Sequence, residues 1–375
     1  MQLKAAIKRN FYHFKVYNLY AFLFLLKTYY DIIKEWKSDT MEEIEKLDMI
    51  DNSSNTEVLD MSTPNVQPTK HRLSIIETYG ENLSSKTFIT DPAIGREQEI
   101  NEMILALITP DKSALLVGKP GIGKTAIVEG LGYRINNGQA PNALKGWNII
   151  KINIPSLLGN SKTEDGNTES RLQLLLQELK ELDHTILFID EVHLLVNKAA
   201  SNNGIDFANM LKPFLDRGTI KMIGATTTEE YEAYILRDRA FLRRFIKIDI
   251  AEADEATVVK ILMGTYPKFE KKMGLKLAYT DFQKEQIFKF LVSATSEYKR
   301  VYEMQSRYPD ITLTLLANAF SYALFENSSE VKLSHIYKAL CNFKGIYPDA
   351  KVKEIAKFKE TFADWLAQEN ANLDA

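Results

Sequence analysis

The chain has 375 residues, a formal net charge of −3 and a single cysteine. Its length allows two or three domains with full hydrophobic cores. The near-neutral charge excludes the strongly basic composition typical of nucleic-acid-binding proteins, so we expect no nucleic-acid partner. The lone Cys341 excludes an internal disulfide framework and is typical of a reducing compartment, which predicts a cytoplasmic protein.

Residues 1–37 differ in composition from the rest of the chain. Basic residues surround an aromatic-rich stretch in which Leu19–Leu26 is uninterrupted and apolar. This run is shorter than the roughly 20 residues that a membrane-spanning helix needs. Two hypotheses remain open. The segment is either a helix that binds a membrane surface or a partner, which would associate the protein peripherally with membranes, or a helix that packs on the protein's own body.

Residues 38–78 have the composition of a linker. Eight acidic residues lie between Asp39 and Asp60, against the single Lys46, and a stretch rich in Ser and Asn follows. We predict a solvated, flexible spacer over residues 38–78. Order is expected to resume near Tyr79, and the apolar spacing of Ile100–Ile108 predicts an amphipathic helix.

The strongest pattern in the chain begins with Ala114–Val117, a short apolar run typical of a buried parallel strand. A glycine loop of the form GxxxxGK[ST] follows, and helical spacing resumes after it. The loop and the residue after it are Gly118, Lys119, Pro120, Gly121, Ile122, Gly123, Lys124, Thr125 and Ala126. Glycines let successive backbone N–H groups point at phosphate oxygens, and the following helix adds its positive end. This context predicts a nucleotide site in which Lys124 contacts the β- and γ-phosphates and Thr125 ligates Mg²⁺.

Two carboxylates follow a second buried strand. Trp147–Ile154 is predicted to be a strand and Ser170–Leu182 a helix; then Thr185–Ile189 forms an apolar strand that ends in Asp190 and Glu191. Asp190 is placed to hold Mg²⁺ through water, and Glu191 to polarise the attacking water as a general base. Because this pair follows a good phosphate loop by about 65 residues, it supports ATP hydrolysis rather than binding alone.

A third strand, Ile220–Ala225, ends in three threonines, one of whose hydroxyls can sense the γ-phosphate. Farther on, Arg243 and Arg244 lie between aromatic residues. Paired arginines are usually surface charge, but at this distance after the third strand they fit arginine fingers that reach a neighbour's nucleotide.

From Glu252 the pattern is wholly helical, with helices predicted at Asp254–Gly264, Lys284–Tyr298, Ile311–Glu326 and Ser334–Leu340. Residues from Asp349 onward are expected to form a charged helix whose aromatic residues, Phe358, Phe362 and Trp365, are spaced by four and three. This helix either covers the body or binds a neighbour.

On these residues the chain resembles the first ATPase domain of the Clp chaperones (ClpA, ClpB and ClpC type), within the AAA+ superfamily. The resemblance covers about residues 79–345. It is carried by Tyr79–Leu83, Asp91–Glu97, Gly118–Gly130, Asn137–Pro141, Phe188–His193, Gly224–Thr227, Arg243–Phe245 and Tyr308–Asp310.

The resemblance implies an α/β fold, namely an AAA+ P-loop αβα wedge with a parallel sheet over residues 79–250. An α-helical lid would follow over residues 251–345, with a C-terminal helix or tail over residues 346–375. It also implies ATP and Mg²⁺ as cofactors and a homo-oligomeric ring, usually a hexamer, that acts on protein clients or a partner complex.

Carried over residue by residue, the resemblance implies that Lys124 and Thr125 bind phosphate and Mg²⁺. It also implies that Asp190 supports the metal and that Glu191 activates water. It makes Thr227 the sensor of the γ-phosphate and makes Arg243 and Arg244 fingers acting in trans. It also places Ile94 and Gly95 in the adenine pocket and Asp310 in the sensor-2 region.

One departure from the family concerns its pore loop. Glu164 occupies the position of the pore aromatic, and an acidic ring cannot grip an extended chain by apolar contact. The resemblance covers the first ATPase domain alone, and a second one is not expected. Two hypotheses therefore stand: an ATPase ring that remodels or disassembles protein partners, and a structural or assembly ATPase subunit of a larger, membrane-proximal complex. A nucleic-acid remodelling ATPase fits the acidic balance poorly.

Overall fold

The computed structural model describes residues 75–157, 160–162, 168–196, 207–216, 218 and 220–369. All of them belong to one unit of the chain, His71–Ala375. The basic segment 1–37, the linker up to residue 74 and Glu164 lie outside the described residues, so the hypotheses about them stay predictions. None of the helices in the described ranges is long and apolar enough to cross a membrane.

A six-stranded sheet forms the centre of the first part of this unit. Its strand order is β1-β3-β6-β7-β2-β8, and only the edge pair β1–β3 is antiparallel. The strands are β1 (Gly80–Asn82), β2 (Ser113–Val117), β3 (Asn148–Ile152), β6 (Thr185–Ile189), β7 (Lys221–Thr226) and β8 (Phe245–Asp249). All five residues of β2 and of β6 are buried, which explains why each strand is a continuous apolar run after its first residue, Ser113 or Thr185.

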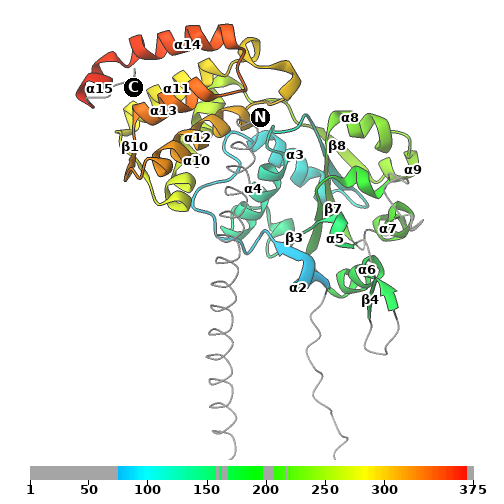
Figure 1. Ribbon diagram of the computed structural model, residues 1–375. Helices are drawn as coiled ribbons and strands as arrows, with labels where there is room; N and C mark the ends of the chain where they lie inside the picture. Colours follow the sequence, from blue (N-terminus) through cyan, green and yellow to red (C-terminus); the bar gives the residue numbers. More distant parts are fainter. Residues whose placement is uncertain are drawn as a thin grey trace, which may run out of the picture. The chain divides into compact units, whose positions relative to one another are not determined.

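Alternate residues of these strands enter two separate cores. In β2, Leu115 and Val117 pack in one core, whereas Ala114 and Leu116 pack in the other. The first core also receives α6 (Arg171–Glu181) and α7 (Phe207–Asp216); the second receives α3 (Glu97–Ile108) and α4 (Lys124–Asn136). Helices thus cover both faces of a mostly parallel sheet, and the αβα prediction is confirmed (Figure 1).

Short elements connect these layers. They are α2 (Ile75–Tyr79), the 3₁₀ turns Asn142–Leu144 and Val192–Leu195, α5 (Ile154–Leu157), the hairpin β4 (Asn160–Lys162) and β5 (Thr168–Ser170), α8 (Thr228–Glu230), the π-helical turn Tyr231–Ile235, and α9 (Arg239–Leu242). The predicted strand Trp147–Ile154 was too long, because the chain turns into α5 at Ile154.

The second part of the unit is helical, as predicted, and has its own core. It contains α10 (Glu255–Met273), α11 (Asp281–Ala294), α12 (Asp310–Phe325), α13 (Leu333–Asn342), α14 (Pro348–Thr361) and α15 (Ala363–Gln368). The short 3₁₀ turns Glu297–Lys299 and Tyr302–Met304 precede α12. A two-stranded parallel ladder, β9 (Lys276–Leu277) with β10 (Glu330–Val331), was not predicted.

Helix α10 ends nine residues beyond Gly264, where the prediction ended it. It continues through Pro267 to Met273 and stops where Gly274 adopts φ 69°. A proline inside a helix removes one hydrogen bond and strains the preceding turn. Phe269 and Met273, which lie beyond the proline, pack against the helical core, so tertiary packing offsets that local cost.

The C-terminal residues pack on the body of the same chain. Phe358 and Phe362 are buried, and both rings contact Phe290 of α11, with centroids 5.3 and 5.5 Å away. The predicted single helix is two helices, because the backbone leaves helical geometry at Phe362. Of the two roles left open for this segment, covering the body is the one observed among the described residues.

We predict that Phe358→Ala lowers the free energy of unfolding by about 3–5 kcal/mol, because the ring is fully buried and its removal leaves a cavity. Val352→Ala is the matched control on the same helix, since Val352 is 68% exposed and should change stability by less than about 0.5 kcal/mol. Chemical denaturation measures both. Equal effects of the two substitutions would contradict the packing of α14 on this core.

Candidate functional site

The glycine loop joins the carboxyl end of β2 to the start of α4. Gly118 follows the strand directly, and a Cβ atom there would lie 2.5 Å from the carbonyl oxygen of Ile250. Gly123 precedes the helix with φ 96°, a left-handed conformation that favours glycine. Because both glycines are required by the backbone path, the loop can turn its N–H groups toward the space above the first turn of α4.

Lys124 is the first residue of α4, and its side chain folds back onto the glycine loop. Its ammonium Nζ donates hydrogen bonds to the carbonyls of Gly118, at 2.7 Å, and Lys119, at 3.0 Å. Burial lowers the pKa of Lys124, while the nearby carboxylates of Asp190 and Glu230 oppose that shift. A half-buried ammonium whose hydrogen bonds go to neutral carbonyls is well suited to an anionic ligand, whose charge would stabilise it further.

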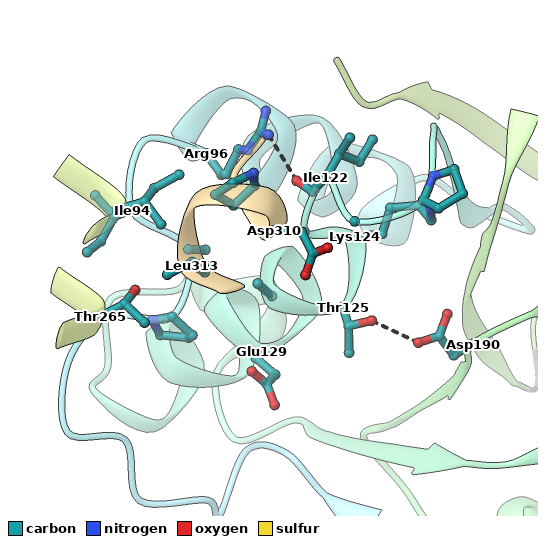
Figure 2. Close-up of a pocket in the computed structure, with 18 of the residues that line it drawn as sticks. Ile94, Arg96, Ile122, Lys124, Thr125, Glu129, Asp190, Thr265, Asp310 and Leu313 are labelled. Atoms are coloured by element: carbon teal, nitrogen blue, oxygen red, sulfur yellow. Dashed lines mark hydrogen bonds between the residues drawn. The ribbon is translucent and has the colours of Figure 1, made fainter. Parts of the chain in front are cut away.

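Thr125 and Asp190 meet across the sheet edge. The Thr125 hydroxyl donates to Asp190 Oδ2 at 2.8 Å, so the first turn of α4 is joined to the end of β6 (Figure 2). Glu191 follows with φ 54°, its side chain exposed and its N–H donating to Asp190 Oδ1 at 3.1 Å. A hydroxyl and a carboxylate are the hard oxygen donors that Mg²⁺ prefers, so these residues fit the predicted metal.

Most of the residues predicted for nucleotide binding and catalysis line one cavity of about 530 Å³. Those that line it are Ile94, Pro120, Gly121, Ile122, Gly123, Lys124, Thr125, Ala126, Asp190, Glu191, Thr227 and Asp310. In Figure 2, Ile94 and Leu313 lie toward one end, whereas Lys124, Thr125 and Asp190 lie toward the other. The cavity therefore has an apolar end suited to a base and a charged end suited to phosphates.

Five predicted residues do not line this cavity. Gly118 and Lys119 belong to the glycine loop but do not line the cavity. Gly95, which also lies outside the lining, has φ 71° and lies against Thr257. The two arginines differ from each other. Arg243 is exposed, whereas Arg244 is only 5% exposed and donates to the carbonyl of Ala240. The two therefore differ in exposure, and the role of both as fingers stays a prediction.

Several lining residues were not predicted. They are Pro92, Ala93, Arg96, Glu129, Thr226, Glu230, Ile261, Thr265, Lys268, Pro309 and Leu313. Three of them, Ile261, Thr265 and Lys268, lie on α10 at spacings of four and three. This spacing predicts that they share one face of a helix, but it does not predict which part of the protein that face contacts. The predicted end of α10 at Gly264 excluded two of them.

Arg96 has a structural part in the site. It is buried, its Nη1 donates to Glu99 Oε1 at 2.7 Å, and its Nη2 donates to the carbonyl of Ile122 at 3.1 Å (Figure 2). A buried guanidinium needs such partners, and here one of them is the glycine loop itself. Arg96 therefore ties the start of α3 to the loop.

Residues 114–249 match the family model described as ATPase family associated with various cellular activities (AAA). These residues are an AAA domain. The chain is 41% identical over 249 residues to the chaperone protein ClpB of Aquifex aeolicus. The matched stretch covers 66% of this chain and 24% of ClpB. It is 39% identical over 213 residues to the chloroplastic chaperone ClpC1 of rice (Oryza sativa subsp. japonica), covering 56% and 23%.

Among solved structures, Hsp104 with ATPγS and FITC casein, in a closed state, matches with a TM-score of 0.63 and 31% identity. The match covers 78% of this chain and 49% of the Hsp104 chain. The Saccharomyces cerevisiae Hsp104–ADP complex matches with a TM-score of 0.61. The resemblance to Clp chaperones is confirmed, although the chain spans only about a quarter of the length of the ClpB and ClpC1 relatives.

We predict that Lys124→Ala weakens binding of a fluorescent ATP analogue by at least about tenfold, because a charge-assisted contact to phosphate is lost. Lys119→Ala is the matched control, since its exposed side chain lies outside the cavity and only its carbonyl contacts Lys124. Fluorescence titration measures both affinities. Equal affinities for the two variants would mean that Lys124 does not contact the nucleotide.

Proposed function

We propose that this chain is an ATP-hydrolysing protein of the Clp chaperone type, which uses hydrolysis within a ring to remodel or disassemble protein partners. The observation that carries the proposal is the contact between Thr125 and Asp190 at 2.8 Å, with Glu191 beside it at the mouth of the same cavity. A site for binding alone would need the loop, but it would not need a carboxylate positioned to activate water.

ATP would bind with its base between Ile94 and Leu313 and its phosphates over the loop. Backbone N–H groups and the Lys124 ammonium would hold the β- and γ-phosphates. Thr125 would hold Mg²⁺ directly and Asp190 through water; the bound ion supplies positive charge that stabilises the phosphate oxygens during transfer. ATP and Mg²⁺ are therefore the proposed cofactors, supported by the AAA domain and by the donor set of the site.

Glu191 would act as the general base. Its carboxylate is exposed at the cavity wall, where it can accept a proton from a water that attacks the γ-phosphorus. The Thr227 hydroxyl lines the same cavity and would contact the γ-phosphate. Asp310 enters from α12, so the helical part would respond to the nucleotide at the sheet edge.

Arg243 would complete the site of a neighbouring copy. Because it is exposed and lies outside its own cavity, any contact with nucleotide has to be made in trans. Closed head-to-tail assembly then gives a ring, for which we propose a hexamer. The relatives named ClpB and ClpC1 are chaperones, and one matched structure contains Hsp104 with casein; this likeness favours protein clients over a fixed assembly role.

We predict that Glu191→Gln lowers the turnover of ATP by about 10²–10⁴-fold, because the amide cannot accept the proton of the attacking water. Affinity for ATP should stay within about threefold of the wild type, since the phosphate contacts are unchanged. Phosphate release and nucleotide titration measure the two quantities. Unchanged turnover would assign the base to another residue.

We predict that Arg243→Ala lowers turnover on the order of 10³-fold through the loss of a charge on the transferred phosphate. Arg239→Ala is the control, because Arg239 is an exposed arginine on the neighbouring α9.

Mixing equal amounts of the Arg243→Ala and Glu191→Gln chains should restore roughly a quarter of wild-type turnover, since about one site in four combines an intact base with a neighbour's arginine. A mixture as inactive as its components would contradict action in trans.

A further inference from the structure

Glu230 lines the same cavity as Lys124, Asp190 and Thr227. It follows Thr227 by three residues at the first turn after β7. The Glu230 N–H donates to Thr227 Oγ1 at 3.2 Å, and the Thr227 N–H donates to Glu230 Oε2 at 3.1 Å. This reciprocal pair is a capping box, which stabilises the start of a helix. The helix it starts, α8, is only three residues long, so helix stability alone is a small gain.

The capping box also orients the Thr227 hydroxyl. A hydroxyl has one proton and two lone pairs, and here one lone pair accepts the Glu230 N–H. The Thr227 side chain also lowers the pKa of the Glu230 carboxylate by hydrogen bonding, so its proton has an acceptor in Glu230 until a phosphate oxygen takes that place. Because Thr227 lines the same cavity as Lys124 and Asp190, its hydroxyl can turn its proton toward a phosphate oxygen bound there.

The carboxylate of Glu230 is itself held from a second element. Oε2 accepts from the Thr226 hydroxyl at 3.3 Å and lies 3.1 Å from Nδ1 of His193. His193 is buried in the turn that follows Asp190 and Glu191, and its ring stacks on Tyr234. The end of β7 is thereby attached to the segment that carries the catalytic carboxylates.

The charge of Glu230 persists despite its partial burial. Burial alone would raise the pKa of Glu230, but hydrogen bonds from Thr227 and the nearby His193 lower it below the ordinary value. Glu230 also lies close enough to Lys124 to influence the pKa of that ammonium. A carboxylate at the phosphate end opposes an anionic ligand, so retaining one there requires a benefit other than binding.

We propose that Glu230 is a positioning residue for ATP hydrolysis, which aims the Thr227 hydroxyl at the γ-phosphate and ties it to the Asp190–Glu191 segment through His193. This inference rests on the proposed function. A positioning role changes turnover without weakening the affinity for ATP, whereas a merely structural role would impair both. Removing Glu230 lowers turnover because Thr227 is no longer oriented, whereas affinity for ATP is kept or rises because a negative charge has left the phosphate end.

The test uses the full chain with Glu230→Ala, Glu230→Gln and the control Glu229→Ala. Glu229 is the adjacent glutamate; it is exposed and does not line the cavity. We expect Glu230→Ala to lower kcat about tenfold without raising the Kd for a nonhydrolysable ATP analogue. Glu230→Gln, which keeps an oxygen acceptor for the Thr227 N–H, should lie between Glu230→Ala and the wild type. Glu229→Ala, which also removes a negative charge that acts on Lys124, should keep the wild-type kcat.

A double-mutant cycle with Thr227→Val identifies the route. If Glu230 acts through the Thr227 hydroxyl, Glu230→Ala lowers kcat in the wild-type background but has little further effect in the Thr227→Val background. Additive effects, an unchanged kcat, or a parallel loss of affinity and melting temperature would overturn the proposal. A wild-type chain that does not hydrolyse ATP would overturn the proposed function itself.

Discussion

The site depends on the way parallel strands end at one edge of the sheet. Strands β2, β7 and β6 are neighbours in that order, so the glycine loop, the threonines and the carboxylates emerge side by side. In the sequence, more than 100 residues separate Gly118 of the loop from Thr226. The hydrogen bond between Thr125 and Asp190 measures this convergence directly. Each proposed role, from phosphate binding to the activation of water, requires these strand ends to keep their register.

That register is maintained by burial on both faces of the sheet and by charges that are paired where they are buried. Leu115 and Leu116 point into opposite cores, so a shift of one residue would exchange their surroundings. Near the cavity, Arg96 is joined to the loop and Glu230 to His193, and each of these contacts satisfies a group whose burial would otherwise be costly. Lys124 differs from these two residues, because its hydrogen-bond partners are neutral carbonyls. A bound anionic ligand would supply the negative charge that those carbonyls do not carry.

Much of this arrangement could be predicted from the sequence, for reasons that also explain the failures. Strands Ala114–Val117 and Thr185–Ile189 were recognisable because full burial requires apolar runs, and the loop between β2 and α4 because phosphate binding restricts its residues. Helix α10 was cut short at Gly264 because the packing of Phe269 beyond Pro267 cannot be read from local propensity. The burial of Arg244 could not be predicted either, because two adjacent arginines have the same side chain and the sequence does not indicate which of them the fold buries. Glu230 was overlooked because its significance lies in its contact with His193, 37 residues earlier in the chain.

The central claim is that the complete catalytic site forms only between copies of this chain. Its most direct test is the turnover of ATP per chain, measured over a wide range of protein concentrations beside sedimentation of the same samples. We expect turnover per chain to rise with concentration in parallel with the ring, because dilution removes the neighbour's Arg243 from each site. Turnover per chain that stays constant from the monomer to the ring would contradict the account.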